Sequence, residues 1–281
     1  MPLRFSEEYP EIKGALNFEV KKVLFSSRSE FQKIEIVETE SFGRVLIIDD
    51  FIMLTERDEF VYHEMIAHTP LFVHPNPEKV LIIGGGDGGT VRECCKHESV
   101  KRIDLVDIDR MVTQACIQFM PAVAEKFFSR RVNCFFEDGV AFVHNSRERY
   151  EVIIIDSTDP ISVGEGLFTS EFYKNCANIL SDDGILVAQS ESPFWTPELL
   201  QSIAKKLKSV FPRVFFYQAH IPTYPSGQWA FSFATKKYHP LKNFQESLVA
   251  DFPHNLQYYN AEIHRGAFAI PTFVRKLVDE V

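Results

Sequence analysis

Val80-Leu81-Ile82-Ile83-Gly84-Gly85-Gly86-Asp87-Gly88-Gly89-Thr90 is the stretch that decides the fold of this 281-residue chain. Its apolar first part is continuous rather than alternating, as in a strand that is buried on both faces of a parallel sheet. The glycines that follow allow a sharp turn and a close approach of the backbone to a ligand. They satisfy the G-x-G-x-x-G pattern of a nucleotide-binding turn. A glycine-rich turn that binds nothing is the alternative, but the setting between a predicted strand and a predicted helix favours a nucleoside site.

Strand and helix patterns alternate around this turn. Predicted strands cover residues 79–83, 103–106, 132–136, 152–155, 185–188, 214–217 and 229–234. Predicted helices cover residues 59–72, 90–97, 111–119, 170–180 and 197–210. Repeated strand–helix units with short connections predict a mostly parallel sheet with helices on both of its faces.

The N-terminal region has a different pattern. Two β-rich runs, residues 31–37 and 44–48, are followed or joined by short turns and predict antiparallel strands. Such strands are too few to enclose a large core by themselves. We therefore divide the chain into an N-terminal β-strand domain, residues 1–58, and a nucleoside-binding α/β domain, residues 59–281.

Asp87 restricts the kind of nucleoside that the glycine turn can bind. A dinucleotide would place its pyrophosphate against this turn and the start of the next helix. A carboxylate beside two phosphates would repel them at a low effective dielectric constant, whereas a carboxylate beside a cation would attract it. The sequence therefore favours a ligand that is positively charged or neutral at this point.

Acidic side chains also follow the other predicted strands. These residues are Asp107, Asp138, Asp156, Asp159 and Glu191, with Gln189 beside the last. Ligands of open α/β sheets bind outside the carboxyl ends of the strands, so these side chains are expected around one crevice. A single Asp in such a place is most often a helix cap. A cluster of them is costly unless cations bind there, and it therefore predicts a cationic ligand.

The bulk properties exclude several classes of function. The formal net charge of −9 disfavours binding to nucleic acid or to an anionic membrane surface. No apolar run approaches the roughly 20 residues of a membrane-spanning helix, and the first eight residues contain no apolar signal core. The five cysteines include no CxxC pair and are expected to be reduced thiols. We expect a cytoplasmic protein.

From Tyr9 to about Lys237 the chain resembles the spermidine synthases, the aminopropyltransferases of polyamine synthesis. The matching segments are TERDEFVYHEM at 55–65, GGGDGG at 84–89, VDID at 106–109, DSTDP at 156–160 and IPTYPSG at 221–227. The resemblance implies a small N-terminal antiparallel β domain on a methyltransferase-like, Rossmann-type α/β catalytic domain with a mostly parallel seven-stranded sheet. It implies transfer of the aminopropyl group of decarboxylated S-adenosylmethionine to putrescine, giving spermidine and methylthioadenosine.

The resemblance also implies roles for individual residues. Nucleoside-binding residues would be Gln32, Asp87, Asp107, Ile108, Asp138 and Gly139, with Asp107 on the ribose hydroxyls, Ile108 on the adenine ring and Asp138 on its amino group. Asp87 would bind the ammonium of the aminopropyl arm. Asp156 would accept the proton, assisted by Tyr62. The polyamine would contact His63, Asp87, Asp156, Ser157, Thr158, Asp159, Gln189 and Tyr224.

No prosthetic group and no metal are expected, because a sulfonium is already an activated leaving group. The sequence H-E-x-x-x-H at 63–68 is one residue longer than the zinc motif of metalloproteases, and residues five apart do not share a helix face. Decarboxylated S-adenosylmethionine would be the co-substrate, and the family implies a homodimer or homotetramer. Val163 departs from the family, in which a proline near the adenine is usual, so the shape of the 161–168 loop stays open.

Three other functions compete with aminopropyl transfer. A methyltransferase on the same scaffold would use intact S-adenosylmethionine, whose extra carboxylate Asp87 would oppose. A non-catalytic polyamine or nucleoside sensor would not require Asp156 together with Tyr62. A dehydrogenase is disfavoured by Asp87. Putrescine is the expected acceptor on resemblance alone, because the length of a diamine channel is a three-dimensional property.

Overall fold

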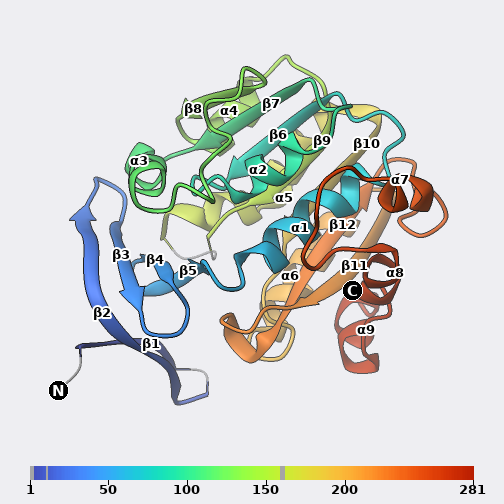
Figure 1. The fold of residues 1–281 in the computed structure, drawn as a ribbon. Coiled ribbons are helices and arrows are strands. Elements are labelled where there is room, and N and C mark those ends of the chain that lie inside the picture. Colours follow the sequence, from blue (N-terminus) through green and yellow to red (C-terminus); the bar gives the residue numbers. More distant parts are fainter. Residues whose placement is uncertain (1–2, 11, 159–161) are drawn as a thin grey trace.

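Two sheets organise the chain in a computed structural model that describes residues 3–10, 12–158 and 162–281. A five-stranded antiparallel sheet is formed by the N-terminal residues, and a seven-stranded, mostly parallel sheet lies in the rest of the chain. Figure 1 shows the small sheet beside one end of the large one. The predicted fold class, with an N-terminal antiparallel β domain on an α/β domain, is confirmed.

The small sheet is a meander in which each strand pairs with the next. Its strands are β1 (Leu3–Tyr9), β2 (Gly14–Arg28), β3 (Lys33–Thr39), β4 (Arg44–Ile48) and β5 (Phe51–Thr55). Alternation along β3 sends Ile34 and Ile36 toward the α/β core, whereas Val37 packs with Val45 and Ile47 in a separate apolar cluster. One face of the small sheet is therefore part of the main core.

The large sheet has the strand order β11-β12-β10-β9-β6-β7-β8. Its strands are β6 (Lys79–Gly84), β7 (Arg102–Asp107), β8 (Val132–Phe136), β9 (Tyr150–Asp156), β10 (Leu180–Gln189), β11 (Arg213–His220) and β12 (Gln228–Thr235). Only β12 runs antiparallel to its neighbours β10 and β11. The chain moves from β6 to β7 and β8 on one side, and then returns to β9 on the other side of β6. The strand order thus reverses between β6 and β9, which is where open α/β sheets bind ligands.

Helices cover both faces of this sheet. They are α1 (Glu59–Leu71), α2 (Gly89–Cys95), α3 (Arg110–Phe119), α4 (Gly139–Asn145), α5 (Ser170–Ile179), α6 (Pro197–Lys208), α7 (Glu246–Ala250), α8 (Ala261–Ala267) and α9 (Thr272–Asp279), with short 3-10 helices η1 (Ser162–Phe168) and η2 (Pro225–Gly227). Successive residues of β6 serve opposite faces. Val80 and Ile82 belong to the cluster that includes α1, α2 and α3, and Leu81 and Ile83 belong to the cluster that includes α5 and α6.

The structure adds elements that the sequence pattern did not indicate. Helix α4 is only seven residues long and was not predicted, because two turns give little periodicity to detect. Strand β10 begins at Leu180 rather than at Ile185, and its register with β9 shifts between these two residues. Among the described residues, no helix is long and apolar enough to cross a membrane.

Candidate active site

A cleft of about 930 Å³, open solvent included, lies at the carboxyl ends of β6, β7, β8 and β9. The small sheet contributes Gln32, Leu46, Ile48 and Met53 to its wall. The α/β part contributes Tyr62, His63, Ile83, Gly84, Gly85, Gly86, Asp87, Val106, Asp107, Ile108, Val112, Asp138, Gly139, Asp156, Ser157, Thr158, Gly164, Leu167 and Tyr224. Residues from both sheets thus face one cavity, at the point where the strand order reverses.

The glycine turn brings the ends of β6 and β9 into contact. Gly84 has a φ of +81°, and a Cβ atom there would lie 2.1 Å from the carbonyl oxygen of Asp156. The next amide, that of Gly85, donates to the same carbonyl oxygen at 2.8 Å. No residue with a side chain could occupy position 84 without moving β9. The turn therefore positions Asp156 as well as the floor of the cleft.

Asp156 ends β9, and its carboxylate accepts hydrogen bonds from two hydroxyl groups on the helices around it. Tyr62 on α1 donates to Oδ1 and Thr90 on α2 donates to Oδ2, both at 2.6 Å. Both donors are neutral hydroxyls. Burial, and next the charge of Asp87, raise the pKa of Asp156 above its ordinary value. A carboxylate with a raised pKa is a stronger base. The site therefore reduces the difference between the pKa of the Asp156 carboxyl group and that of an alkylammonium.

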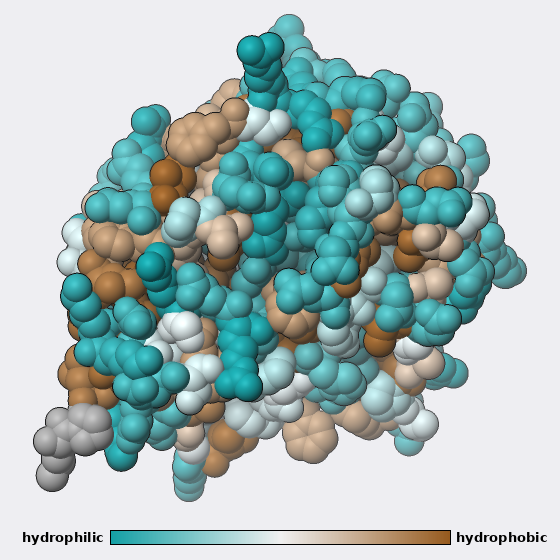
Figure 2. All heavy atoms as spheres, viewed as in Figure 1, coloured by the Kyte–Doolittle hydropathy of each residue, from teal (hydrophilic) through white to brown (hydrophobic). Residues whose placement is uncertain are grey.

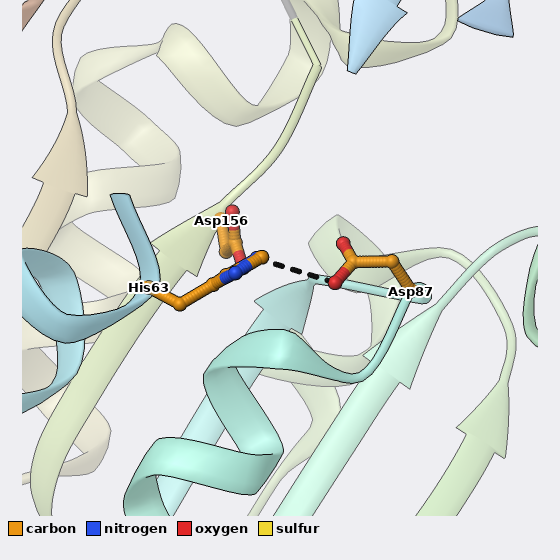
Figure 3. A group of neighbouring side chains, drawn as sticks. All are labelled: His63, Asp87 and Asp156. Atoms are coloured by element: carbon orange, nitrogen blue, oxygen red, sulfur yellow. Dashed lines mark ion pairs between the residues drawn. The ribbon is translucent and has the colours of Figure 1, made fainter. Parts of the chain in front are cut away.

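His63 lies between two carboxylates. Its Nδ1 is 2.5 Å from Oε2 of Glu59, one turn earlier in α1, and its Nε2 is 3.2 Å from Oδ1 of Asp87. Figure 3 shows the imidazole of His63, the carboxylate of Asp87 and that of Asp156 converging from α1, the glycine turn and the end of β9. Burial alone would raise the pKa of Asp87, but the charge and hydrogen bond of His63 lower it.

These three side chains are also the one group with a metal-ligating geometry in the part of the chain that the structure describes. Their ligand atoms all lie within 4.8 Å of one another. A metal would need a free imidazole lone pair. Both ring nitrogens of His63 already face carboxylate oxygens, Glu59 on one side and Asp87 on the other. A protonated imidazole satisfies both of these contacts and has no free lone pair for a metal ion.

Asp107, at the end of β7, is fixed by backbone amides. Its Oδ2 accepts from the amide of Gly86 at 3.0 Å, and its Oδ1 accepts from the amide of Asp109 at 2.8 Å. Burial raises the pKa of Asp107 to about 6, although both amide hydrogen bonds oppose that rise. The carboxylate faces the cleft beside Ile108, where two hydroxyl groups of a ribose could share it.

Gln32 approaches the same end of the cleft from the small sheet. Its Nε2 donates to Oδ2 of Asp109 at 3.0 Å, and Ser29 donates to the same oxygen at 2.6 Å. Asp109 also caps α3 by accepting from the amide of Met111. The VDID segment thus connects the β domain to the cleft through Asp109.

Asp138 and Gly139 lie at the outer edge of the cleft, at the start of α4. Asp138 is exposed and caps this helix by accepting from the amide of Val140 at 2.8 Å. Gly139 is buried against Ile83, where a Cβ atom would lie 2.7 Å from the Ile83 methyl. Both residues line the cleft, and Asp138 combines a helix-capping contact with that position.

A second cavity, of about 410 Å³ with open solvent included, adjoins the first. Five residues line both cavities: Met53, Tyr62, Ser157, Thr158 and Tyr224. The remaining lining residues are Glu7, Phe51, Ile52, Gln189, Pro225 and Trp229. Within the described residues, Oγ of Ser157 and Nε1 of Trp229 are buried without a hydrogen-bond partner, so a ligand or water is needed to satisfy them.

Every predicted site residue that the structure describes lines one or both of the two cavities. Gln189 lines only the second cavity, where its Nε2 donates to the carbonyl of Ser157 at 3.3 Å. Asp159 lies outside the described residues, as does the side chain of Val163.

Sequence reasoning gave no role to three residues that hold the site. Thr90 bonds to Asp156, and Arg92 bonds to Glu59, which in turn bonds to His63. Glu59 lies within the 55–65 segment, and Thr90 and Arg92 closely follow the 84–89 segment. Nothing in their spacing indicates these partners.

Two family models match the chain. Residues 59–247 match the spermine/spermidine synthase domain, and residues 4–56 match the spermidine synthase tetramerisation domain. The polyamine aminopropyltransferase of Alkaliphilus metalliredigens (strain QYMF) is 46% identical over 281 residues, covering 99% of both chains. That of Clostridioides difficile (strain 630) is 46% identical over 283 residues, covering 100% of both.

Solved structures are similar over the whole chain. A spermidine synthase in complex with the transition-state analogue AdoDATO gives a TM-score of 0.97 at 40% identity, covering 100% of this chain and 97% of that one. The spermidine synthase from Thermotoga maritima gives a TM-score of 0.96 at 39% identity, with the same coverage.

Proposed function

The chain belongs to the spermine/spermidine synthase family of aminopropyltransferases, and from this premise we propose that it transfers the aminopropyl group of decarboxylated S-adenosylmethionine to putrescine. The products are spermidine and methylthioadenosine. One observation carries the proposal: Asp156, a buried carboxylate held by two neutral hydroxyls, lines the nucleoside-sized cleft, and its donor Tyr62 and its neighbour Ser157 line both this cleft and the second cavity. A proton acceptor that is bonded to a residue shared by the two cavities fits a transfer between two substrates.

The nucleoside occupies the larger cleft in this proposal. Asp107 accepts from the ribose hydroxyls, Ile108 packs on the adenine, and Asp138 accepts from the adenine amino group beside Gly139. Gln32 closes this end from the β domain. Support comes from the fixed orientation of Asp107, whose two backbone donors leave it facing the cleft.

Asp87 binds the ammonium of the aminopropyl arm and thereby selects the decarboxylated nucleoside. Intact S-adenosylmethionine carries a carboxylate on the carbon that bears this ammonium. That carboxylate would face Asp87 in a half-buried site, and like charges at such separation repel strongly. The same charge argument disfavours a methyltransferase that uses intact S-adenosylmethionine.

The diamine occupies the second cavity and reaches toward Asp156 past Tyr62, His63, Ser157 and Tyr224. Its amine nitrogen, with an ordinary pKa near 10 like that of lysine, must be neutral to attack. The raised pKa of Asp156 makes this carboxylate a better acceptor for the proton. Holding the nitrogen in line behind the reacting carbon would supply most of the rate. Thr158, Asp159 and Gln189 complete the proposed diamine contacts.

We propose a homo-oligomer, either a dimer or a tetramer, that forms through the N-terminal β domain in the cytoplasm. Large apolar side chains are exposed on or beside β1 and β2, namely Leu3, Ile12 and Val23. Figure 2 shows apolar side chains gathered at its left edge, over the N-terminal strands. Exposed apolar surface of this kind is typical of a contact between subunits. All five cysteines are free thiols, which fits a reducing compartment.

Product analysis tests the proposal directly. The purified protein is incubated with decarboxylated or intact S-adenosylmethionine and with a panel of diamines of increasing length, and the products are identified by mass spectrometry. We expect spermidine and methylthioadenosine from the decarboxylated nucleoside and putrescine. A methylated product would support the methyltransferase instead. Binding of both ligands without turnover would support a sensor.

A further inference from the structure

Both ring nitrogens of His63 face carboxylate oxygens, and this fixes the charge of the ring. Nδ1 lies 2.5 Å from Glu59 and Nε2 lies 3.2 Å from Asp87. A neutral imidazole has one N–H group, whereas an ionised carboxylate can only accept hydrogen bonds. A neutral His63 would therefore point a lone pair at one of the two carboxylates. The side chain is only 3% exposed, so little water can reach it to relieve that repulsion, and the imidazolium alone satisfies both contacts.

Glu59 is held in place from the next helix. The guanidinium of Arg92 on α2 donates to both oxygens of Glu59 on α1, each at 2.8 Å. Burial opposes the ionisation of Glu59, but the hydrogen bonds and charges of His63 and Arg92 outweigh it and lower the pKa. Glu59 is thus an oriented carboxylate whose ionised form is favoured, and it presents Oε2 to His63.

The imidazole ring of His63 packs against the glycine turn. A Cβ atom at Gly89 would lie 2.2 Å from Cε1 of His63 and within 2.4 Å of both ring nitrogens. The ring therefore packs directly on the first residue of α2. The backbone amide of Gly89 donates to Oδ1 of Asp87 at 2.8 Å, so the turn positions both members of the His63–Asp87 pair.

The charges that face His63 come from every element packed around it. Helix α1 contributes Glu59, and the turn before α2 contributes Asp87. Strand β9 contributes Asp156, whose carboxylate is within 4.8 Å. Arg92 lies behind Glu59. Tyr62 is neutral, because burial and the nearby charge of Asp156 raise its pKa. Burial lowers the pKa of His63, but Asp87 and Glu59 together raise it to about 10.

We propose that Glu59, held by Arg92, is a positioning residue that keeps His63 as a buried cation, and that this cation favours the neutral, nucleophilic form of the diamine nitrogen beside Asp156. The inference rests on the proposed aminopropyl transfer. The protonated reacting nitrogen of the diamine and ionised Asp156 together carry no net charge, and they carry one negative charge after a proton leaves for solvent. A fixed cation within a few ångströms favours that loss, because the pair titrates as a unit.

The reaction then proceeds from a neutral amine. Its lone pair forms the new N–C bond to the aminopropyl carbon, while the electron pair of the C–S bond stays on sulfur and converts the sulfonium to a neutral thioether. The new secondary ammonium transfers its proton to Asp156, which passes it to solvent. The sulfonium charge acts on the incoming nitrogen in the same direction as His63, so both cations lower the fraction of diamine that is protonated in the site.

The pH dependence of kcat, which reports the ionisation of groups in the complex with bound diamine, tests the role of the cation. His63→Gln removes the charge but retains a polar side chain. We expect the acidic limb of its profile to move toward higher pH by roughly one unit or more, with activity recovering as the pH is raised. Glu59→Gln should shift the limb in the same direction by a smaller amount. A limb that does not move in His63→Gln would overturn the proposal.

Glu64→Gln is the matched control. Glu64 is a glutamate on the same helix, 1% exposed, but its oxygens accept from the backbone amides of Gln257, Tyr258 and Tyr259 on the other side of α1. This substitution should lower the stability of the fold without displacing the pH profile. An equal displacement in Glu64→Gln and Glu59→Gln would mean that both glutamates are merely structural.

The titration of His63 gives a readout that does not depend on turnover. In protein labelled with ¹⁵N-histidine, the ring signals lost in His63→Gln identify this residue among the nine histidines. We expect both nitrogens to show the imidazolium shift through neutral pH, and the titration midpoint to fall in Glu59→Gln. An unchanged midpoint would overturn the role of Glu59 even if the enzyme is active. A protein that shows the predicted titration but no aminopropyl transfer would instead contradict the proposed function.

Discussion

The two ends of the cleft hold their carboxylates by different means. At the nucleoside end, Asp107 and Asp138 accept hydrogen bonds from the backbone amides of Gly86, Asp109 and Val140. At the amine end, Asp156 is held by the side chains of Tyr62 and Thr90, and Asp87 accepts from the amide of Gly89 but also faces the ring of His63. Backbone donors orient a carboxylate without neutralising it, whereas the amine end contains its own cation. The first end is suited to recognising neutral hydroxyl and amino groups, and the second to controlling a proton.

The largest effect should follow from removing Asp156, the proposed base at the amine end. Asp156→Asn keeps the size of the side chain but cannot accept the proton, so kcat should fall by about 10²- to 10⁴-fold. The affinity for the nucleoside should change little, because the nucleoside end is held independently. Steady-state kinetics and calorimetric binding of methylthioadenosine measure the two quantities.

Asp104→Asn is the control for this substitution. Asp104 on β7 is fully buried and bonds to Tyr150, Arg102 and Asn133, away from the cleft. Its loss should lower the free energy of unfolding but leave kcat close to that of the original protein. If Asp156→Asn retained full activity, Asp156 would not be the proton acceptor.

The next largest effect should come from moving His63 without altering it. Gly89→Ala places a methyl group where the imidazole lies, and the ring must shift. A displacement of about 1 Å in a reacting site costs on the order of 10²-fold in rate. Gly266→Ala in α8 meets nothing within 4 Å and should leave the rate unchanged. Measurements of kcat at one pH compare the two variants. An equal kcat in both would show that the packing of His63 on Gly89 has no effect on turnover.

The two ends also differ in what the sequence alone could predict. The capping bond of Asp138 and one of the two bonds of Asp107 are to residues two positions away, as expected for an Asp that follows a strand and precedes a helix. The bond between Tyr62 and Asp156 joins residues 94 positions apart, and that between Arg92 and Glu59 joins residues 33 apart. No local pattern encodes such pairs, and the roles of Tyr62 and His63 were accessible only through a family resemblance.

The fold could be predicted from the sequence more fully than the ionisation of the site residues. Continuous apolar strands such as Val80–Ile83 and the glycine turn predicted the sheet, because burial on both faces leaves a clear pattern. The raised pKa of Asp156 depends on its burial and on the neighbouring charge of Asp87. Both arise only when the chain folds and brings the two residues together. Short elements such as α4 were missed because too few residues carry the periodicity.

A moderate effect is expected at Asp107, in binding rather than in turnover. Asp107→Asn should weaken nucleoside affinity by about 10- to 100-fold, because hydrogen bonds to a charged acceptor are lost. Its pKa of about 6 adds a pH dependence. The bound nucleoside favours the carboxylate, so below pH 6 a proton must leave on binding, and affinity should fall by up to about tenfold per pH unit. Binding measured by calorimetry from pH 7 to pH 5 tests this, and an affinity that does not vary with pH would exclude Asp107 as the titrating contact.

The smallest effect should occur at Asp138, where capping and recognition can be separated. Asp138→Ala removes both the cap of α4 and the proposed acceptor for the adenine amino group, so the free energy of unfolding should fall by about 1 kcal/mol and nucleoside affinity by a few-fold. Asp138→Ser retains a side-chain oxygen that caps a helix as well as aspartate does, but it lacks a carboxylate that reaches into the cleft. Thermal unfolding should therefore recover in the serine variant while nucleoside binding stays weak. If binding recovered together with stability, Asp138 would act on the nucleoside only by holding α4, and recognition at this end would depend on backbone groups alone.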